Sequence, residues 1–347
     1  MSRSFFITNV AIDACACRVR DLVWPAPGSN KGVLGVIARG EPPWLVDTET
    51  GKPATVPQTA GCVGMAFRPV LKTEINGARN QECAIVYGDS VNFVNFYDVA
   101  LGSWLQPMPF ARAQSVAYSQ QGDKLAIGTS TGSLALIELN DGHRRRERFF
   151  KPICKSAIVR LMFTGQGESV IALTAGGAIY SIDVQTGASS EQTFVGANED
   201  LDFECWAHAV HDVGRIAVFA GSAYRATGKC NLWVADLDKG LSVAIETGHR
   251  AYVRRVQFLR GMKVVACGDN GAEFYDLNTR KRLSVKASGD RLATAYAAME
   301  VGPLTFVVGT GASVKEKIDD AGMVAQGGNV ELGGAELERA ESVKVSA

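Results

Sequence analysis

The most strongly charged stretch of the sequence is a basic segment that could bind an acidic ligand. Against the single acid Glu147, it carries six basic side chains between residues 143 and 155, namely Arg144, Arg145, Arg146, Arg148, Lys151 and Lys155. Such a cluster attracts an acidic peptide or a nucleic acid. We favour a solvated loop between two structural units as its interpretation, and we keep a docking site as the alternative.

A second basic group consists of Arg250, Arg254 and Arg255. The run from Val253 to Phe258 alternates between apolar and polar residues, so it predicts a strand that begins beside these arginines. Loops at strand ends are common binding sites on a rigid β scaffold. We therefore expect Arg254 and Arg255 to contact a partner.

Two sequence patterns could indicate catalysis or metal binding, but the secondary structure predicted around each of them argues against it. The run from Gly128 to Gly132 matches the G-x-S-x-G pattern of a hydrolase, but an alternating strand follows it where that motif requires a helix. His208 and His211 are three residues apart, which places them on opposite faces of a strand. We predict a hairpin turn around Ser130, no metal site, no cofactor and no enzymatic activity.

Composition narrows the class of protein. Lys plus Arg and Asp plus Glu both number 36 in 347 residues, so the formal charge is zero, and binding to a polyanion by bulk charge is disfavoured. The sequence contains no apolar run of the length that a membrane helix needs and no secretory signal. Eight scattered cysteines fit reduced thiols packed as small apolar side chains. We expect an intracellular protein, nuclear or cytoplasmic.

The elements that position these residues follow from an internal repeat. An acidic residue between apolar ones recurs with a glycine four positions later. The pairs are Asp47 and Gly51, Asp98 and Gly102, Glu138 and Gly142, Asp183 and Gly187, and Asp236 and Gly240, and in the sixth copy Asp276 precedes Arg280. We predict that the acid accepts hydrogen bonds from the backbone of a hairpin turn and that the glycine supplies its left-handed residue.

A second marker is a glycine that ends an apolar run. It occurs at Gly40, Gly88, Gly128, Gly176, Gly221, Gly268 and Gly309. The spacing of about 40 to 48 residues is the length of one four-stranded propeller blade. Helical periodicity is nearly absent. The sequence therefore predicts an all-β fold, a seven-bladed β-propeller in a single domain 1–347, with blades at about 17–58, 62–108, 114–150, 157–194, 204–247, 253–286 and 292–347. We expect a strand at 4–10 to join the last blade and close the ring.

These repeats resemble the WD-repeat propellers over essentially the whole chain. No blade has the Trp-Asp dipeptide, and the Gly-His dipeptide of that family occurs once, at Gly248-His249. A narrower resemblance is to the propellers of the spindle checkpoint and mRNA export. Its residues are the run from Asn278 to Leu283, the run from Val307 to Gly311, a polar insertion at 315–320 and the run from Asn329 to Leu332. This resemblance implies binding of a peptide segment of a larger partner across one face of the ring.

We therefore expect a non-catalytic scaffold for protein–protein interaction, of kinetochore or mRNA-export type. The alternatives are a structural subunit of a coat or nuclear-pore assembly, and a propeller hydrolase. A protein partner is expected, and nucleic acid is not favoured. By position alone, the contact residues are predicted to be Arg39, Asp89, Ser130, Arg254, Arg255 and Asp269.

Overall fold

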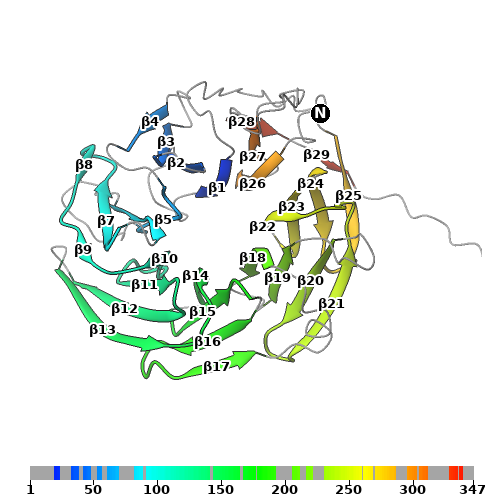
Figure 1. Cartoon of the computed structure of the whole chain (residues 1–347). Helices are drawn as coiled ribbons and strands as arrows, with labels where there is room; N and C mark the ends of the chain where they lie inside the picture. The colour runs from blue at the N-terminus through cyan, green and yellow to red at the C-terminus, as the bar shows by residue number, and fades with distance from the viewer. Residues whose placement is uncertain are drawn as a thin grey trace, which may run out of the picture.

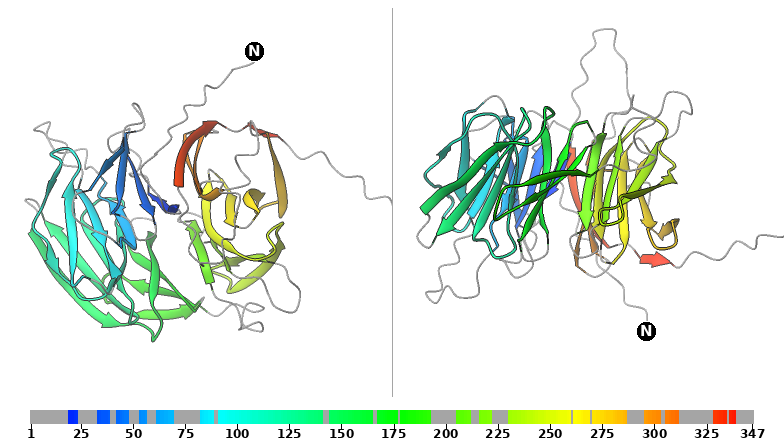
Figure 2. Two further views of the ribbon diagram at one scale, coloured as in Figure 1. Left: turned by 45° about the horizontal axis from the view of Figure 1, so that its top comes forward. Right: turned by 90° about the horizontal axis from the view of Figure 1, so that it is seen from below.

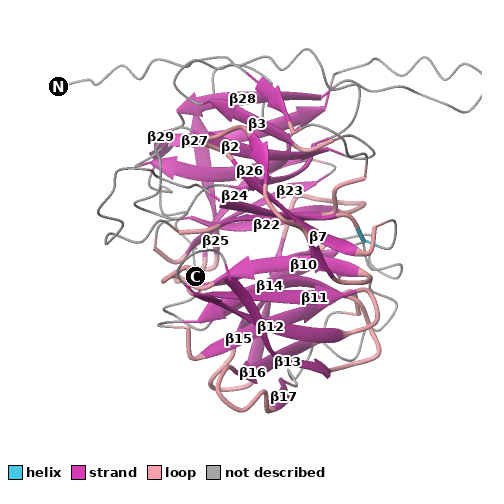
Figure 3. Ribbon diagram, turned by 90° about the vertical axis from the view of Figure 1, so that its left-hand side faces the viewer, coloured by secondary structure: helices cyan, strands magenta, loops and turns pink. Residues whose placement is uncertain are grey.

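The structure is a computed structural model of the whole chain. It describes residues 19–23, 33–38, 42–47, 53–56, 61–69, 82–88, 91–140, 144–164, 167–176, 178–192, 205–211, 216–221, 230–259, 261–268, 270–286, 295–302, 305–311, 328–334 and 336–338. Apart from a 3-10 position at Gly88, the regular structure of this part consists of strands, as Figure 3 shows, and no α-helix occurs in it. The prediction of an all-β fold is confirmed.

The strands of the described residues form seven sheets, and except for β29 the members of each sheet follow one another along the chain. Sheet 1 contains β1 (Val19–Val23), β2 (Val33–Ala38), β3 (Trp44–Asp47) and β4 (Pro53–Thr55). Sheet 2 contains β5 (Gly64–Phe67), β6 (Glu82–Val86), β7 (Phe93–Asp98), β8 (Ser103–Trp104) and β9 (Met108–Pro109). Sheet 3 contains β10 (Ala113–Tyr118), β11 (Lys124–Thr129), β12 (Ser133–Asn140) and β13 (Arg144–Pro152).

The second half of the chain continues in the same manner. Sheet 4 contains β14 (Ile158–Thr164), β15 (Ser169–Thr174), β16 (Ile179–Asp183) and β17 (Ser189–Gln192). Sheet 5 contains β18 (Cys205–His211), β19 (Ile216–Gly221), β20 (Asn231–Asp236) and β21 (Leu241–Glu246). Sheet 6 contains β22 (Val253–Leu259), β23 (Lys263–Gly268), β24 (Gly271–Asp276), β25 (Lys281–Lys286) and, from the end of the chain, β29 (Glu336–Glu338). Sheet 7 contains β26 (Ala295–Gly302), β27 (Thr305–Gly311) and β28 (Gly328–Gly334).

The sheets are arranged around a common centre, with the first strand of each sheet innermost (Figure 1). Seen from the side, the strands run across the thickness of the molecule, so their turns gather on two opposite rims (Figure 2). We call the rim on which each first strand begins the upper rim. Among the described residues it includes 110–113, 129–133, 153–158, 174–176, 178, 247–253, 268, 270 and 271. The opposite, lower rim carries the turns that join third and fourth strands.

The core lies between consecutive sheets, and each of sheets 2 to 5 packs apolar side chains against both of its neighbours. One cluster joins Val94 and Phe96 of sheet 2 to Leu125 and Ile127 of sheet 3, and similar clusters link sheets 1 and 2, 3 and 4, 4 and 5, and 5 and 6. Second strands such as β6 and β11 are buried along nearly their whole length. Burial on both faces is the reason for the continuous apolar runs in the sequence.

The glycines that end two of these runs stand where neighbouring backbones come close. A Cβ atom at Gly128 would lie 2.6 Å from both Ser115 Oγ and Ile158 Cγ2. A Cβ atom at Gly268 would lie 2.2 Å from the carbonyl oxygen of Tyr252. Glycine is therefore required here by close approach, since any side chain would push the adjacent strand away.

The predicted role of the Asp-x-x-x-Gly element is confirmed in the described turns. Asp98 Oδ1 accepts hydrogen bonds from the backbone N–H groups of Ala100 and Leu101, each at 2.9 Å. The carboxylates of Asp183, Asp236 and Asp276 accept from their own turns in the same way. The residue four positions later is left-handed each time: Gly102 (φ 64°), Gly187 (φ 66°), Gly240 (φ 64°) and Arg280 (φ 55°).

The two ends of the described chain meet. Strand β1 lies against β26, β27 and β28, so sheets 1 and 7 are neighbours. Within the predicted interval 292–347, β26 to β28 form sheet 7, whereas β29 pairs with β25 of sheet 6. The predicted closing strand at 4–10 and the insertion at 315–320 lie outside the described residues.

Candidate interaction surface

The loop that leads into β22 is held in place by a buried carboxylate. Glu273, on β24, is 1% exposed, and its Oε2 accepts a hydrogen bond from the backbone N–H of Gly248 at 2.8 Å. The other oxygen, Oε1, accepts from Asn270 Nδ2 at 3.0 Å and lies 3.0 Å from Arg282 Nη1. The Tyr275 hydroxyl also donates to Glu273. One side chain therefore connects the loop before β22, the β23–β24 turn and β25.

His249 completes this arrangement, which we call the Glu273 cluster. Its imidazole is buried, with Nε2 3.7 Å from Glu273 Oε2, and its Nδ1 accepts a hydrogen bond from the backbone N–H of Asn270 at 3.2 Å. The backbone N–H of His249 donates to Thr247 Oγ1, whose hydroxyl donates to the carbonyl of Cys230 in sheet 5. Residues 247–252 are therefore fixed between sheets 5 and 6.

What this loop presents at the upper rim is a cationic and aromatic surface. Arg254 occupies a β-bulge, because the register of β22 against β23 shifts between Val253 and Arg255. Its guanidinium stacks over the ring of Tyr252, 4.5 Å from the centroid, while Arg250 is exposed in the same loop. Bulges re-aim a side chain and recur near functional sites. Arg250, Tyr252 and Arg254 together form what we call the β22 surface.

Arg255 has a different environment from its neighbour. Only 7% of it is exposed, and its Nη2 donates to Gln257 Oε1 at 3.2 Å. Burial leaves little of this side chain for a partner to touch. Of the two adjacent arginines, Arg254 is the more accessible, although it is half-buried and its Nε atom is enclosed.

The remaining predicted contact residues are separated from the β22 surface or cannot be placed. Ser130 lies half-buried in the β11–β12 turn of sheet 3, where its backbone N–H donates to the carbonyl of Arg112 at 3.0 Å. This turn is also part of the upper rim. Arg39, Asp89 and Asp269 lie outside the described residues.

The basic segment is not the loop that we predicted from its charge. Residues 144–152 of it form β13, the outermost strand of sheet 3. This strand pairs with β12 from Asn140↔Arg144 to Ser133↔Pro152, with a bulge at Arg148. The apolar Phe149 packs into the core between sheets 3 and 4, which is why this strongly charged sequence is still a strand. The sequence of the strand shows no alternation of apolar and polar residues that would have predicted it.

Several basic side chains of β13 fasten sheets together. Arg145 reaches back to sheet 2, where its Nη2 lies 2.8 Å from Oε2 of the buried Glu82 and its guanidinium covers the Phe96 ring at 3.6 Å. The Tyr118 hydroxyl donates to the other oxygen of Glu82 at 2.7 Å. We call these four residues the Glu82 cluster. Arg145 is therefore a structural residue of the sheet 2–sheet 3 contact.

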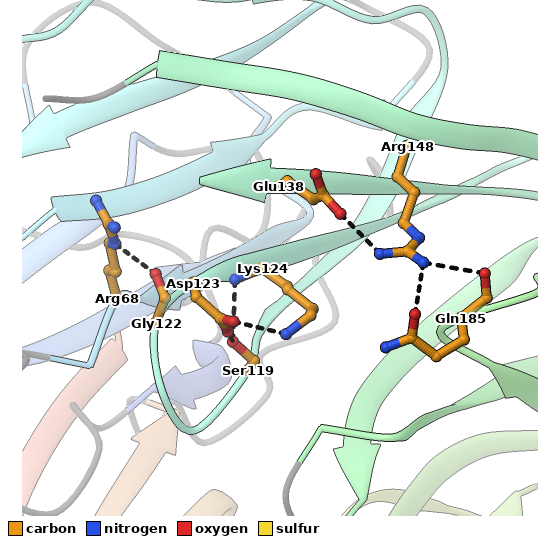
Figure 4. A network of polar contacts seen from close by, with 8 residues as sticks. All are labelled: Arg68, Ser119, Gly122, Asp123, Lys124, Glu138, Arg148 and Gln185. Atoms are coloured by element: carbon orange, nitrogen blue, oxygen red, sulfur yellow. Dashed lines mark hydrogen bonds and ion pairs between the residues drawn. The ribbon is translucent and has the colours of Figure 1, made fainter. Parts of the chain in front are cut away.

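Other side chains of β13 reach forward to sheet 4, on the side shown in Figure 4. Arg148 Nη1 lies 2.7 Å from Glu138 Oε1, and its Nη2 donates to both the carbonyl and the side-chain oxygen of Gln185. Lys151 Nζ donates to the carbonyl of Thr186. Arg146 is exposed, and Arg144 begins the strand. Of the predicted basic patch, Arg145, Arg148 and Lys151 thus bind neighbouring sheets.

A further sheet-to-sheet bond lies nearby on the lower rim. Arg68, which follows β5, donates through Nε to the carbonyl of Gly122 in sheet 3 at 2.7 Å (Figure 4). In the same turn Asp123 accepts from Ser119 and Lys124. Partial burial of Asp123 opposes ionisation, but these two bonds outweigh it and lower the pKa of the carboxyl group. Ionised Asp123 therefore holds the turn that receives Arg68.

Each buried glutamate raises the pKa of the tyrosine that it binds. Burial, and then the charge and hydrogen bond of Glu82, raise the pKa of Tyr118 well above its usual range. Burial, and then the hydrogen bond and charge of Glu273, raise the pKa of Tyr275 in the same direction. Each hydroxyl therefore stays protonated as a donor to its carboxylate.

The patterns set aside as catalytic occupy structural positions. The residues from Gly128 to Gly132 form the end of β11 and its turn into β12, so the predicted hairpin at Ser130 is confirmed. His208 and His211 both lie on β18, and the His211 ring packs edge-on against Phe258. Within the described residues no group of three or more His, Cys, Asp or Glu side chains is arranged to hold a metal ion.

The cysteines whose side chains the structure describes are thiols, and all but one of them are buried. Cys62, Cys83, Cys230 and Cys267 lie in the core, and Cys154 is half-buried. Burial raises the pKa of Cys83 and of Cys267, so both remain neutral thiols. Their role as small apolar side chains agrees with the sequence prediction. Cys15 and Cys17 lie outside the described residues, and for Cys205 only the backbone is described.

Sequence reasoning missed the residues that hold the β22 surface in place. Gly248-His249 was a signal, because this dipeptide marks the start of a repeat in the resembling family. Glu273 and Glu82 gave a weaker signal of a buried polar contact, because each is an acid in a strand made mostly of buried residues. Nothing in the sequence indicated which tyrosine or arginine each would meet.

Comparisons with known proteins do not assign the chain to a family. Among the described residues we find no helical segment with the length and apolarity that a bilayer crossing requires. No protein-family model matches the chain, and a search of curated proteins returns no significant match.

Proposed function

We propose that this chain is a seven-bladed β-propeller of WD-repeat type that serves as a non-catalytic scaffold and binds a peptide segment of a larger partner at its upper rim. The observation that carries the functional part is the β22 surface. Arg254 occupies a bulge of β22, and its guanidinium stacks on the Tyr252 ring. The Glu273 cluster fixes the loop that carries Tyr252. A preorganised cation on an aromatic ring suits recognition of an acidic or aromatic peptide side chain.

The propeller assignment is supported by the sheet arrangement. Four-stranded sheets placed around a centre, with core clusters only between neighbours, are typical of radial repetition. Sheet 7 has three strands among the described residues, so one strand position remains for residues 4–10. The resemblance of residues 278–332 to the checkpoint and mRNA-export propellers gives the specific form of the proposal, a nuclear or cytoplasmic complex subunit.

The closure is tested by removing residues 1–12. If the segment 4–10 completes sheet 7, the truncated chain should unfold at a clearly lower temperature, and hydrogen exchange should rise most in β26 to β28. An unchanged melting temperature and unchanged exchange in sheet 7 would refute closure by this segment.

The binding site is tested by affinity purification of the full chain with mass spectrometry of the bound proteins. Arg254→Glu should lose the captured partner, because the charge at the centre of the β22 surface is reversed. The matched control is Lys281→Glu, the same charge change at an exposed position of β25. Equal capture by wild type and by Arg254→Glu would refute the upper-rim site.

A further inference from the structure

Strand β13 presents a long outer edge. It has nine residues, whereas the other fourth strands have three (β4), two (β8), four (β17), six (β21) and six (β25). Within the described chain its pairing partner is β12 alone. An edge strand of this length displays a row of backbone N–H and C=O groups that another strand can pair with. Arg146, Arg148 and Phe150 are exposed on this strand, although Arg148 also binds Glu138 and Gln185.

The molecule itself shows which kind of strand adds to such an edge. Strand β29, with the sequence Glu336-Leu337-Glu338, pairs antiparallel with the end of β25. Its register sets Glu336 opposite Lys286 and Leu337 opposite Val285. An acidic and apolar segment is thus the fifth strand of sheet 6, paired with the basic fourth strand β25.

The charge of β13 favours a ligand of the same type. Glu82 and Glu138 offset Arg145 and Arg148, and Glu147 offsets one more charge, which leaves the strand and its contacts with two basic side chains in excess. Positive charge on an edge discourages pairing with a second copy of itself. The same charge attracts an acidic strand, and directly opposed charges of opposite sign stabilise cross-strand pairs.

The two ends of β13 differ, and this difference sets the direction of a bound strand. Arginines occupy the beginning of the strand, whereas Phe150 lies near its end, 52% exposed and edge-on to Phe110 with ring centroids 5.7 Å apart. An antiparallel ligand runs from the Phe150 end toward the Arg146 end. It therefore needs apolar residues in its N-terminal half and acidic residues in its C-terminal half.

We propose that the outer edge of β13 is a second peptide-binding site, which takes an extended partner segment that is apolar at its N-terminal half and acidic at its C-terminal half as an antiparallel fifth strand of sheet 3. This site is separate from the β22 surface, and it binds through the backbone. Backbone pairing supplies affinity in this mode of recognition, and the side chains supply specificity.

The test uses the full chain and a fluorescent synthetic peptide with Val-Ile-Val in its N-terminal half and Glu alternating with Val in its C-terminal half. Fluorescence anisotropy should show saturable binding that weakens with salt. Arg146→Glu should weaken it about five- to tenfold, because an attraction becomes a repulsion. Lys281→Glu, the matched control, and Arg254→Glu, at the upper rim, should each leave it within about twofold of wild type.

Two altered peptides separate strand addition from general charge attraction. A peptide N-methylated at every amide keeps its charges but cannot donate to the edge, so its binding should be lost. A peptide with the two halves exchanged should bind much more weakly, because its acids then face Phe150. Equal binding of either altered peptide would overturn the proposal.

Hydrogen exchange with mass spectrometry locates the bound strand. The peptide should slow exchange in residues 144–152 and leave β21, the outer strand of sheet 5, unchanged. Slowed exchange at residues 247–253 instead, or release of β29 from β25, would place the peptide elsewhere and refute the site. Because the partner at the β22 surface is measured separately, either proposal can fail while the other stands.

Discussion

Two buried glutamates hold this protein together in different ways. Glu82 of sheet 2 is bound by Tyr118 and Arg145, both of sheet 3. Glu273 of sheet 6 is bound by groups of its own sheet and of the loop that leads into it, including Tyr275 and the backbone of Gly248. Each glutamate is 1% exposed and pairs with a tyrosine and an arginine. The same chemistry thus fastens one sheet to the next in the first case, and in the second it shapes a surface loop.

The difference follows from where each carboxylate sits. Glu82 begins the buried second strand of its sheet, and Tyr118 and Arg145 reach it from the neighbouring sheet. Glu273 lies near the upper rim, within reach of the β23–β24 turn and of residues 247–249. We therefore expect loss of Glu82 to affect global stability, and loss of Glu273 to affect the β22 surface above all.

The largest effect is expected from Glu82→Ala. It leaves the Arg145 guanidinium and the Tyr118 hydroxyl buried without their carboxylate, which should lower the free energy of unfolding by about 3–5 kcal/mol. Urea unfolding of the full chain measures this loss. The double variant Glu82→Leu with Arg145→Met should recover much of it, because a buried ion pair can be replaced by apolar side chains. A double variant less stable than Glu82→Ala would contradict this account.

Glu273→Ala should cost less overall, about 1–3 kcal/mol, because Arg282 is half-exposed and returns to water. Its distinctive effect should be local. The backbone of Gly248 and the Asn270 side chain lose their acceptor, so hydrogen exchange in residues 247–252 should rise and partner capture should fall with it. Glu82→Ala provides the contrast, since exchange should then rise mainly in sheets 2 and 3. If both variants showed the same pattern of hydrogen exchange, the local role of Glu273 and the global role of Glu82 could not be distinguished, and this account would be wrong.

Alkaline pH offers a gentler test of both clusters. The pKa values of Tyr118 and Tyr275 are raised in the folded protein, so each tyrosine stabilises the fold fully below its unfolded value of about 10 and loses that contribution as pH rises toward the folded value. Stability should therefore fall above about pH 10. Tyr118→Phe and Tyr275→Phe should each flatten this fall, as measured by urea unfolding across that range. An unchanged slope in both variants would contradict the raised pKa values.

The smallest effects are expected in the lower-rim turns of the same two sheets. Gly102 in sheet 2 and Arg280 in sheet 6 occupy the same left-handed position, at φ 64° and 55°. Gly102→Arg should destabilise the fold by about 1 kcal/mol, and Arg280→Gly should stabilise it by up to about the same amount. Thermal unfolding of the two variants measures both signs. Shifts of the same sign would show that the two turns are not equivalent.

The sequence by itself was sufficient for the all-β class and for the chemistry of the turns. Those features depend on local physics: a carboxylate at Asp98 or Asp236 accepts from the backbone two and three residues away, and Gly102 or Gly240 adopts an angle that other residues avoid. Continuous apolar runs likewise reflect strands buried on both faces. Ser130 could be removed from consideration as a nucleophile for the same reason, since the strand that follows it is legible in the sequence.

Only the tertiary structure decided what the charged side chains do. Arg145 meets Glu82 across 63 positions of sequence. Arg254 and Arg255 are adjacent in the chain, yet Arg254 is half-buried and Arg255 is buried. Charge alone made the basic segment look like a solvated loop, whereas packing of Phe149 and bonds to two neighbouring sheets make it strand β13. A local pattern fixes backbone conformation, but the partner of a long polar side chain depends on which sheets are brought face to face.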